Sequence, residues 1–145
     1  MKIKIVTLIV LHVIALQSFA QSSKHERAEQ GDSIAQYELG TWYAEMCRGR
    51  SDYADNAFFW LSKSAEKNYA PAVYSIAICY REGIGVDKNN KTAFEWVQKA
   101  ANLNYPLAIF DLGIYYDFGE IVARDQKKAF ELYLKAANLG SWKAM

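Results

Sequence analysis

The sequence is poor in the residues that most enzymes and metal proteins rely on. Its 145 residues include only two histidines and two cysteines. Once the N-terminal segment described below is set aside, His25 is the single histidine, and no second ligand stands at a metal-binding spacing from it. We therefore expect no catalytic residue, no metal site and no cofactor.

An excess of charge of one sign is also missing. The chain has 17 basic and 16 acidic residues, and removal of Lys2 and Lys4 with the N-terminal segment leaves 15 basic residues against 16 acidic ones. A nearly neutral domain has no electrostatic reason to bind nucleic acid. The charge balance excludes nucleic acid as an expected partner.

The N-terminus has the pattern of a secretory signal peptide. Two lysines precede an apolar run over residues 5–16, which is followed by Ser18, Phe19 and Ala20. We expect residues 1–20 to be cleaved, which places the mature domain, residues 21–145, in the periplasm or outside the cell. A membrane anchor is the alternative, but the apolar run is shorter than the ~20 residues that span a bilayer, so no stable membrane span is expected after cleavage.

The chain also contains an internal repeat. Residues 72–77 (Ala-Val-Tyr-Ser-Ile-Ala) correspond to the similar residues 108–113 (Ala-Ile-Phe-Asp-Leu-Gly) after a step of 36, and a related segment at residues 35–40 lies 37 residues earlier. Fixed periods of this size indicate stacked supersecondary units. We predict an all-α, right-handed α-solenoid of stacked antiparallel helix pairs, with repeats over residues 33–68, 69–104 and 105–140, preceded by a half-repeat that caps the stack.

Small and polar residues mark the helix contacts and helix ends. Gly40, Ala77 and Gly113 share one slot, which predicts a close approach of the neighbouring helix there. The second helix of each pair is expected to begin with a capping side chain and to end at a residue that tolerates the left-handed conformation. The expected caps are Ser51 or Asp52, Asn89 and Asp125, and the expected ends are Asn68, Asn104 and Gly140.

The repeat combines alanine, an aromatic residue, Leu-Gly, tyrosine, Gly-x-Gly-Val, aspartate, Lys-Ala, a further aromatic residue, Lys-Ala-Ala and glycine. This pattern resembles the SEL-one-like repeat (SLR) branch of the tetratricopeptide superfamily, most fully in the third repeat, with Asp125, Lys128-Ala129 and residues 135–140. The resemblance implies an exported, non-enzymatic adaptor that holds another protein in the bacterial cell envelope. It also implies two alternatives, an immunity protein against a secreted effector and, from a cysteine-rich subgroup, a β-lactam-binding hydrolase.

One tetrapeptide matches a catalytic signature. Ser64-Ala65-Glu66-Lys67 has the serine-x-x-lysine spacing of penicillin-recognising enzymes, but the companion motifs Ser-Asp-Asn and Lys-Thr-Gly are absent from the sequence. Ser64 also takes the repeat slot of Ala100 and Ala136, so a helix end is the preferred interpretation.

The two cysteines, Cys47 and Cys79, form an even set that favours a disulfide in an oxidising compartment. Their register opposes it. In stacked first helices they differ by five positions, roughly 7 Å of rise, in addition to the ~9 Å between helix axes. A disulfide between them is therefore an open prediction, because bridging requires α-carbons within about 7 Å.

The first helix of each pair is expected to present one face to a partner. Several residues of this face are apolar or aromatic where the fold does not require it, and carboxylates surround them, which suits a protein or peptide carrying Lys or Arg. The alternative is that Ile78, Ile114 and Tyr115 fill a tightly wound core. The predicted partner-binding residues are Glu38, Thr41, Trp42, Glu45, Ser75, Ile78, Glu82, Asp111, Ile114, Tyr115 and Phe118.

The C-terminal end is a second candidate surface. The last helix of the third repeat expects another helix against it, and only residues 141–145 follow. We expect the apolar side near Trp142 to be covered by this stub, by a partner or by a second copy, so self-association through this end is a further expectation.

Overall fold

The computed structural model describes residues 22–140, within which seven helices and no β-strand occur. Residues 22–29 are helical, and the helices that follow are α2 (Ser33–Met46), α3 (Ser51–Glu66), α4 (Ala70–Glu82), α5 (Asn90–Asn102), α6 (Pro106–Phe118) and α7 (Gln126–Asn138). The expected signal peptide and Trp142 lie outside the described residues. Of the helices described, none is long and apolar enough to cross a membrane.

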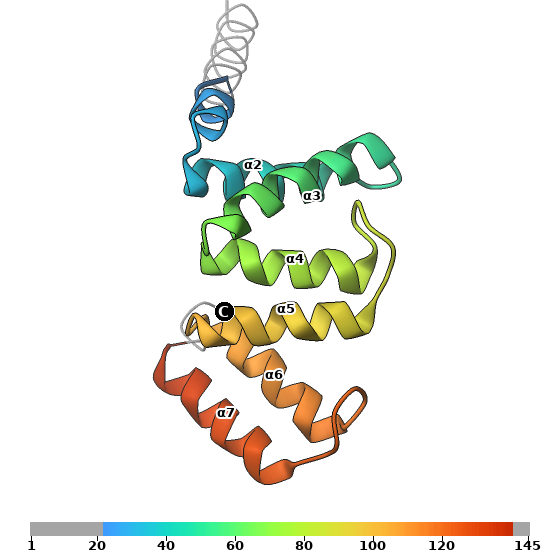
Figure 1. The fold of residues 1–145 in the computed structure, drawn as a ribbon, viewed down its shortest axis with the longest axis vertical. Coiled ribbons are helices and arrows are strands. Elements are labelled where there is room, and N and C mark those ends of the chain that lie inside the picture. Colours follow the sequence, from blue (N-terminus) through green and yellow to red (C-terminus); the bar gives the residue numbers. More distant parts are fainter. Residues whose placement is uncertain (1–21, 141–145) are drawn as a thin grey trace, which may run out of the picture.

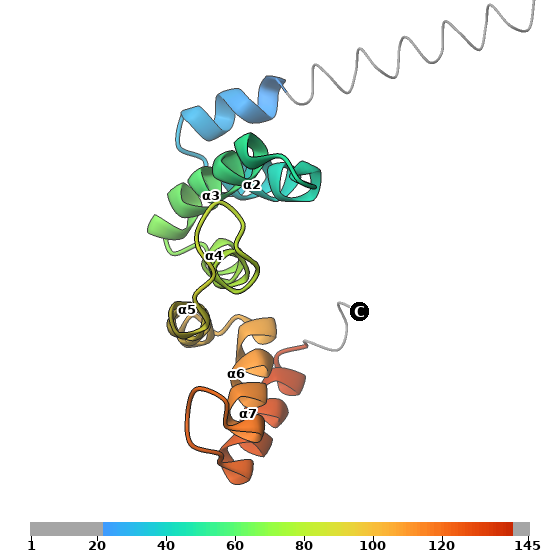
Figure 2. The same ribbon diagram turned by 90° about the vertical axis from the view of Figure 1, so that its right-hand side faces the viewer.

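Consecutive helices pack in pairs, and the pairs stack into an elongated array (Figures 1 and 2). Helix α2 packs on α3, α4 on α5, and α6 on α7, while α3 and α5 also contact the first helix of the next pair. At the N-terminal end, Ala28 in the preceding helix is fully buried. The predicted all-α solenoid of stacked helix pairs is confirmed.

Polar side chains cap the second helices of the last two pairs, as predicted. Asn89 Oδ1 accepts a hydrogen bond from the Thr92 backbone N–H at 3.0 Å, and Asp125 Oδ1 accepts one from the Lys128 backbone N–H at 3.0 Å. Each bond satisfies a backbone donor that has no partner within its own helix.

The predicted cap of α3 is wrong. This helix begins at Ser51, and the residue before it, Arg50, makes no side-chain capping bond. The reason lies in the irregular turn between α2 and α3, where the Arg50 backbone N–H donates to the Cys47 carbonyl at 2.6 Å. The turn is therefore closed by the main chain, and the Arg50 guanidinium lies 4.0 Å from the centre of the Tyr53 ring.

Helix ends and close contacts follow the predicted pattern. Asn68 and Asn104 have φ angles of 57° and 58°, in the left-handed region expected there. A Cβ atom added to Gly40 would lie 2.7 Å from Leu61 Cγ, and one added to Gly113 would lie 2.6 Å from Tyr133 Cε1. Both glycines therefore allow a neighbouring helix to approach more closely than alanine would.

The second helices carry a row of phenylalanines whose exposure depends on what covers them. Phe94 on α5 is only 7% exposed, because α6 packs over it. Phe130, the equivalent residue on α7, is 68% exposed, and no other described helix covers it. The core itself is built from the buried aliphatic residues Leu39, Leu61, Val73, Ile76, Val97 and Ile109.

Candidate functional site

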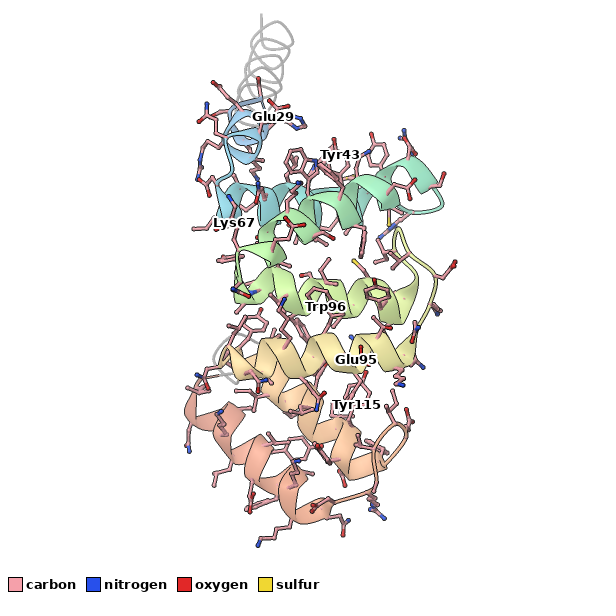
Figure 3. All side chains as sticks on the ribbon, viewed as in Figure 1. Glu29, Tyr43, Lys67, Glu95, Trp96 and Tyr115 are labelled. Atoms are coloured by element: carbon pink, nitrogen blue, oxygen red, sulfur yellow. The ribbon has the colours of Figure 1, made fainter. Side chains whose placement is uncertain are left out.

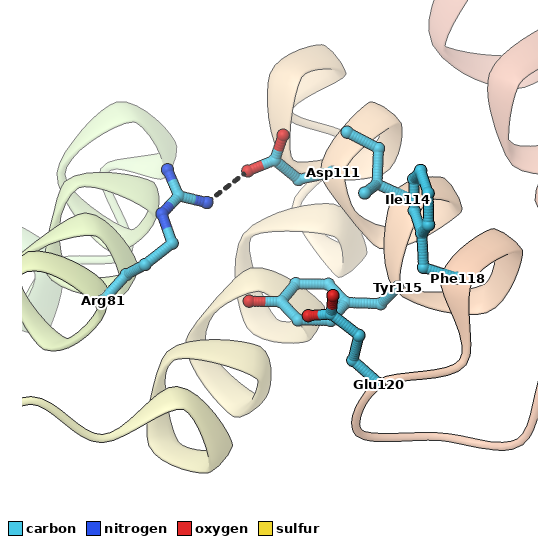
Figure 4. A pocket seen from close by; sticks show the side chains of 6 residues that line it. All are labelled: Arg81, Asp111, Ile114, Tyr115, Phe118 and Glu120. Atoms are coloured by element: carbon cyan, nitrogen blue, oxygen red, sulfur yellow. Dashed lines mark hydrogen bonds and ion pairs between the residues drawn. The ribbon is translucent and has the colours of Figure 1, made fainter.

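A half-open cavity of about 280 Å³ lies beside α6 and is lined mainly by predicted surface residues (Figure 4). The lining residues are Arg81 from α4, Asp111, Ile114, Tyr115 and Phe118 from α6, and Glu120 from the turn after α6. Four of these six belong to the predicted partner face. We refer to this cavity as the α4–α6 pocket.

A three-membered polar network fixes one wall of the α4–α6 pocket. Asp111 Oδ2 accepts a hydrogen bond from the Tyr74 hydroxyl at 2.7 Å and one from Arg81 Nη1 at 3.0 Å. Burial disfavours the Arg81 charge, but the hydrogen bond and attraction to Asp111 outweigh it and raise the pKa of Arg81. Burial, with the nearby carboxylate, also raises the pKa of Tyr74. The network therefore joins α4 to α6 as a neutral ion pair.

Tyr115 lines the pocket and also packs within the solenoid. Its ring meets the buried ring of Phe94 edge to face, with centroids 5.0 Å apart. Burial raises the pKa of its hydroxyl. Of the two interpretations of Tyr115, partner contact and core residue, the structure gives it substantial core character, because its ring packs against buried residues.

Phe118 differs from Tyr115, since 68% of its surface is exposed. The internal repeats offer a comparison, because the equivalent positions in the first and second repeats are Glu45 and Glu82. Both glutamates are exposed, so the fold accepts a carboxylate at this position. Phe118 is therefore not required for packing, and an exposed aromatic ring beside a cavity is typical of a contact site.

The remaining predicted residues are dispersed along the stack. Glu38 forms an ion pair with Lys24 at 3.3 Å, and Trp42 packs on Tyr43 with ring centroids 5.0 Å apart. Glu45 is exposed at the end of α2, and Ile78 is half-buried on α4. Hydroxyl groups turn back onto their own helices, since Thr41 donates to the Glu38 carbonyl and Ser75 to the Pro71 carbonyl, each at 3.0 Å.

Two lining residues, Arg81 and Glu120, were missed by the sequence reasoning. Arg81 lies one position away from the predicted row that contains Glu82, and its long side chain reaches α6 (Figure 4). Glu120 lies in the turn after α6, outside the predicted helix rows. Its signal was a departure from the repeat, because the equivalent residue of the second repeat, Ile84, packs against the core.

The serine and the lysine of the serine-x-x-lysine segment both donate hydrogen bonds to main-chain carbonyls. Ser64 is fully buried and its hydroxyl donates to the Ser33 carbonyl at 2.7 Å, while Lys67 Nζ donates to the Gly31 carbonyl. A nucleophilic serine must reach its substrate, and this one is enclosed.

The described histidine makes local contacts. His25 Nε2 lies 3.4 Å from Glu29 Oε1, and the His25 ring packs edge to face on Trp60. Residues 22–140 hold no cluster of three His, Cys, Asp or Glu side chains suited to a metal ion.

Both cysteines carry free thiols in this structure. Cys79 is 1% exposed and belongs to the core, although it continues the row of Trp42 and Tyr115. Burial, with a smaller contribution from the nearby Cys47, raises the pKa of its thiol to about 12. A Cys47–Cys79 disulfide stays an open prediction, which a count of free thiols in the unfolded protein tests.

Comparison with known proteins places these observations in a family. The family model of the Sel1 repeat matches residues 33–69, 70–105 and 106–141. A Sel1 repeat protein from Oxalobacter formigenes is similar in structure, with a TM-score of 0.70 and 27% identity over 79% of this chain and 46% of that one. A search of curated protein sequences gave no match.

Two further structures share the architecture. A protective antigen present in uropathogenic Escherichia coli strains, with an SLR fold, has a TM-score of 0.73 and 31% identity over 83% of this chain and 26% of that one. Cysteine-rich protein B of Helicobacter pylori has a TM-score of 0.56 and 23% identity over 77% of this chain and 93% of that one, a likeness of fold alone. The chain thus spans less than half the length of the first two relatives. With three consecutive repeats matched, the chain belongs to the Sel1 repeat family.

Proposed function

We propose that the protein is exported and serves as a non-enzymatic scaffold of the bacterial cell envelope, where it binds another protein through the α4–α6 pocket and the surrounding face of its first helices. Sel1 repeat proteins are generally protein–protein interaction scaffolds. The observation that carries the proposal is Phe118, an exposed aromatic residue at a position where the fold accepts glutamate.

A photo-crosslinking experiment in the native envelope tests this function. A photoreactive phenylalanine replaces Phe118 in the full-length chain, and Glu95, an exposed residue on α5 (Figure 3), is replaced in the same way as the control. We expect one dominant adduct from position 118 that is absent from position 95, identified by mass spectrometry. Equal adducts from both positions, or none from position 118, would count against a dedicated interaction face.

Export is tested separately. Fractionation and N-terminal sequencing are expected to give a periplasmic or secreted species that begins at Gln21.

The immunity alternative predicts that the protein crosslinked at position 118 is a single toxic effector, and the gene for that effector should then lie beside the gene for this protein. The hydrolase alternative predicts nitrocefin turnover by the purified protein.

The exposed face of α7 supports the proposed self-association. Phe130 and Leu134 are 68% and 53% exposed on this helix. Apolar residues at such a position favour contact with a further helix. Sedimentation velocity of the purified protein would then show a concentration-dependent dimer, and Phe130→Glu should abolish it. A monomer at all concentrations tested would remove this part of the proposal.

A further inference from the structure

The charges around the α4–α6 pocket do not balance. Arg81 and Asp111 neutralise each other at 3.0 Å. Glu82, beside them, lies 3.6 Å from Arg81 Nε, so the one guanidinium already faces two carboxylates. Glu120, by contrast, is exposed and makes no hydrogen bond or ion pair with any described residue. The lining residues therefore carry one positive and two negative charges, and the carboxylate of Glu120 has no ion-pair partner among the described residues.

The walls beside that carboxylate are apolar and aromatic. Ile114, Tyr115 and Phe118 line the pocket on α6, and Glu120 lines it from the following turn (Figure 4). Aromatic faces attract cations, and hydrocarbon stems pack on aliphatic and aromatic surfaces. A cavity of about 280 Å³ has room for one long side chain.

Two residues that make this environment differ in chemical character from their equivalents in the second repeat. Phe118 stands in place of Glu82, and Glu120 in place of Ile84. Glu82 is exposed, whereas Ile84 packs against the core. The third repeat therefore has an apolar residue where the second has a carboxylate, and a carboxylate two residues later where the second has an apolar residue. The exchange brings an exposed ring and a free carboxylate to the lip of one cavity.

We infer that the α4–α6 pocket binds a lysine or arginine side chain of the protein partner, with the hydrocarbon stem against Ile114 and Phe118 and the cationic head at Glu120. This inference rests on the proposed function and identifies the chemistry that the partner must present. Complementary charge is the argument for this occupant, because the exposed Glu120 carboxylate attracts a cationic head and repels an acidic one.

Short probes test the inference without knowledge of the partner. The ¹⁵N-labelled protein, purified from cells that express the full-length chain, is titrated by NMR with the Nα-acetyl amides of arginine, lysine, norleucine and glutamate. Norleucine keeps the hydrocarbon stem of lysine and lacks the charge. We expect arginine and lysine to shift the backbone amides of residues 118–120 saturably with dissociation constants on the order of 1–10 mM. Norleucine should bind at least about tenfold more weakly, and glutamate should cause no shift.

Charge variants assign the effect to Glu120. Glu120→Gln should weaken arginine binding about fivefold, and Glu95→Gln, which removes an exposed carboxylate from α5, should leave it unchanged. Phe118→Gln should weaken arginine binding by a similar factor.

Several results would overturn the inference. Norleucine binding as tightly as lysine would show an apolar pocket, and tighter binding of glutamate would assign recognition to Arg81. Absence of binding by all four probes, or full arginine affinity in Glu120→Gln, would also reject it. None of these results affects the crosslinking test of the proposed function, which depends only on an adduct from position 118.

Discussion

The ring of Tyr115 meets the ring of Phe94 edge to face, with centroids 5.0 Å apart, across the contact between α5 and α6. Phe118 follows on the same helix and remains 68% exposed. The two aromatic residues therefore share a pocket but differ in what they do for the fold.

Measurements of the free energy of unfolding should distinguish the role of Tyr115 in the fold from that of Phe118. Tyr115→Ala removes a ring packed on the core, so the free energy of unfolding should fall by about 2 kcal/mol. Phe118→Ala should change it by less than about 0.5 kcal/mol, because an exposed ring contributes little to folding. Urea denaturation followed by circular dichroism gives both values. An equal loss in the two variants would mean that Phe118 is also a packing residue.

Substitution at Gly40 tests the close approach of α2 and α3. A new Cβ would lie 2.7 Å from Leu61 Cγ and 2.9 Å from the Leu61 backbone nitrogen, and Leu61 is buried. Because the backbone must shift, Gly40→Ala should cost about 2 kcal/mol despite the better helix propensity of alanine. Thr41→Ala, one residue along α2, is the control and should lie within about 0.5 kcal/mol of wild type. A stabilised Gly40→Ala variant would contradict the close packing of α2 on α3.

The Tyr74–Asp111 hydrogen bond predicts an alkaline limit to stability. Burial, with the Asp111 carboxylate, raises the folded-state pKa of Tyr74 above its ordinary value of about 10. The unfolded chain therefore loses this proton first, and the free energy of unfolding should fall as the pH rises above about 10. In Tyr74→Phe the decline should be shallower by about 1.4 kcal/mol per pH unit.

Urea denaturation at several pH values between 8 and 11 provides that comparison. Tyr116→Phe, on α6, is the control for removal of a tyrosine hydroxyl at another site, where the hydroxyl accepts a hydrogen bond from Lys128 Nζ at 2.8 Å. Parallel declines in wild type and Tyr74→Phe would show that Tyr74 is not held protonated by the fold.

The buried hydroxyl of Ser64 distinguishes a structural from a catalytic serine. Ser64→Ala removes a hydrogen bond of 2.7 Å to the Ser33 carbonyl and should reduce the free energy of unfolding by about 1 kcal/mol. Alanine itself fits, because Ala100 and Ala136 occupy the same repeat slot. Nitrocefin turnover should be absent from both proteins, and turnover that disappears in Ser64→Ala would restore the hydrolase alternative.

The two thiols should respond differently to a thiol reagent. Cys79 is buried and its pKa is raised to about 12, so it should not react until the protein unfolds. Cys47 is only partly buried and should react in the native state. Two free thiols in the unfolded, unreduced protein would exclude the disulfide, and none would establish it.

The sequence predicted the fold well because its information is periodic. A step of 36 residues fixes which residues lie in equivalent places, and each glycine, asparagine or alanine in a shared slot then has a defined task. The cap of α3 could not be predicted in this way, since the turn before it breaks the repeat and is closed by main-chain groups.

The pocket was only partly predictable for a related reason. The rows of α6 gave Asp111, Ile114, Tyr115 and Phe118, because helical spacing decides which side chains share a face. Arg81 reaches across from another helix, and Glu120 depends on the path of a turn. Neither long side-chain reach nor turn geometry is encoded in a helical period, so both residues required the three-dimensional structure.

The unequal exposure of Phe94 and Phe130 has a consequence for how such arrays grow. Phe130 on α7 is equivalent to Phe94 on α5, which α6 covers. No other helix of the described residues covers Phe130. A further helix pair copied from residues 106–140 would meet a surface already shaped for it. The fold therefore allows further repeats to stack on α7. The number of repeats, and not closure of the fold, sets the length of such a solenoid.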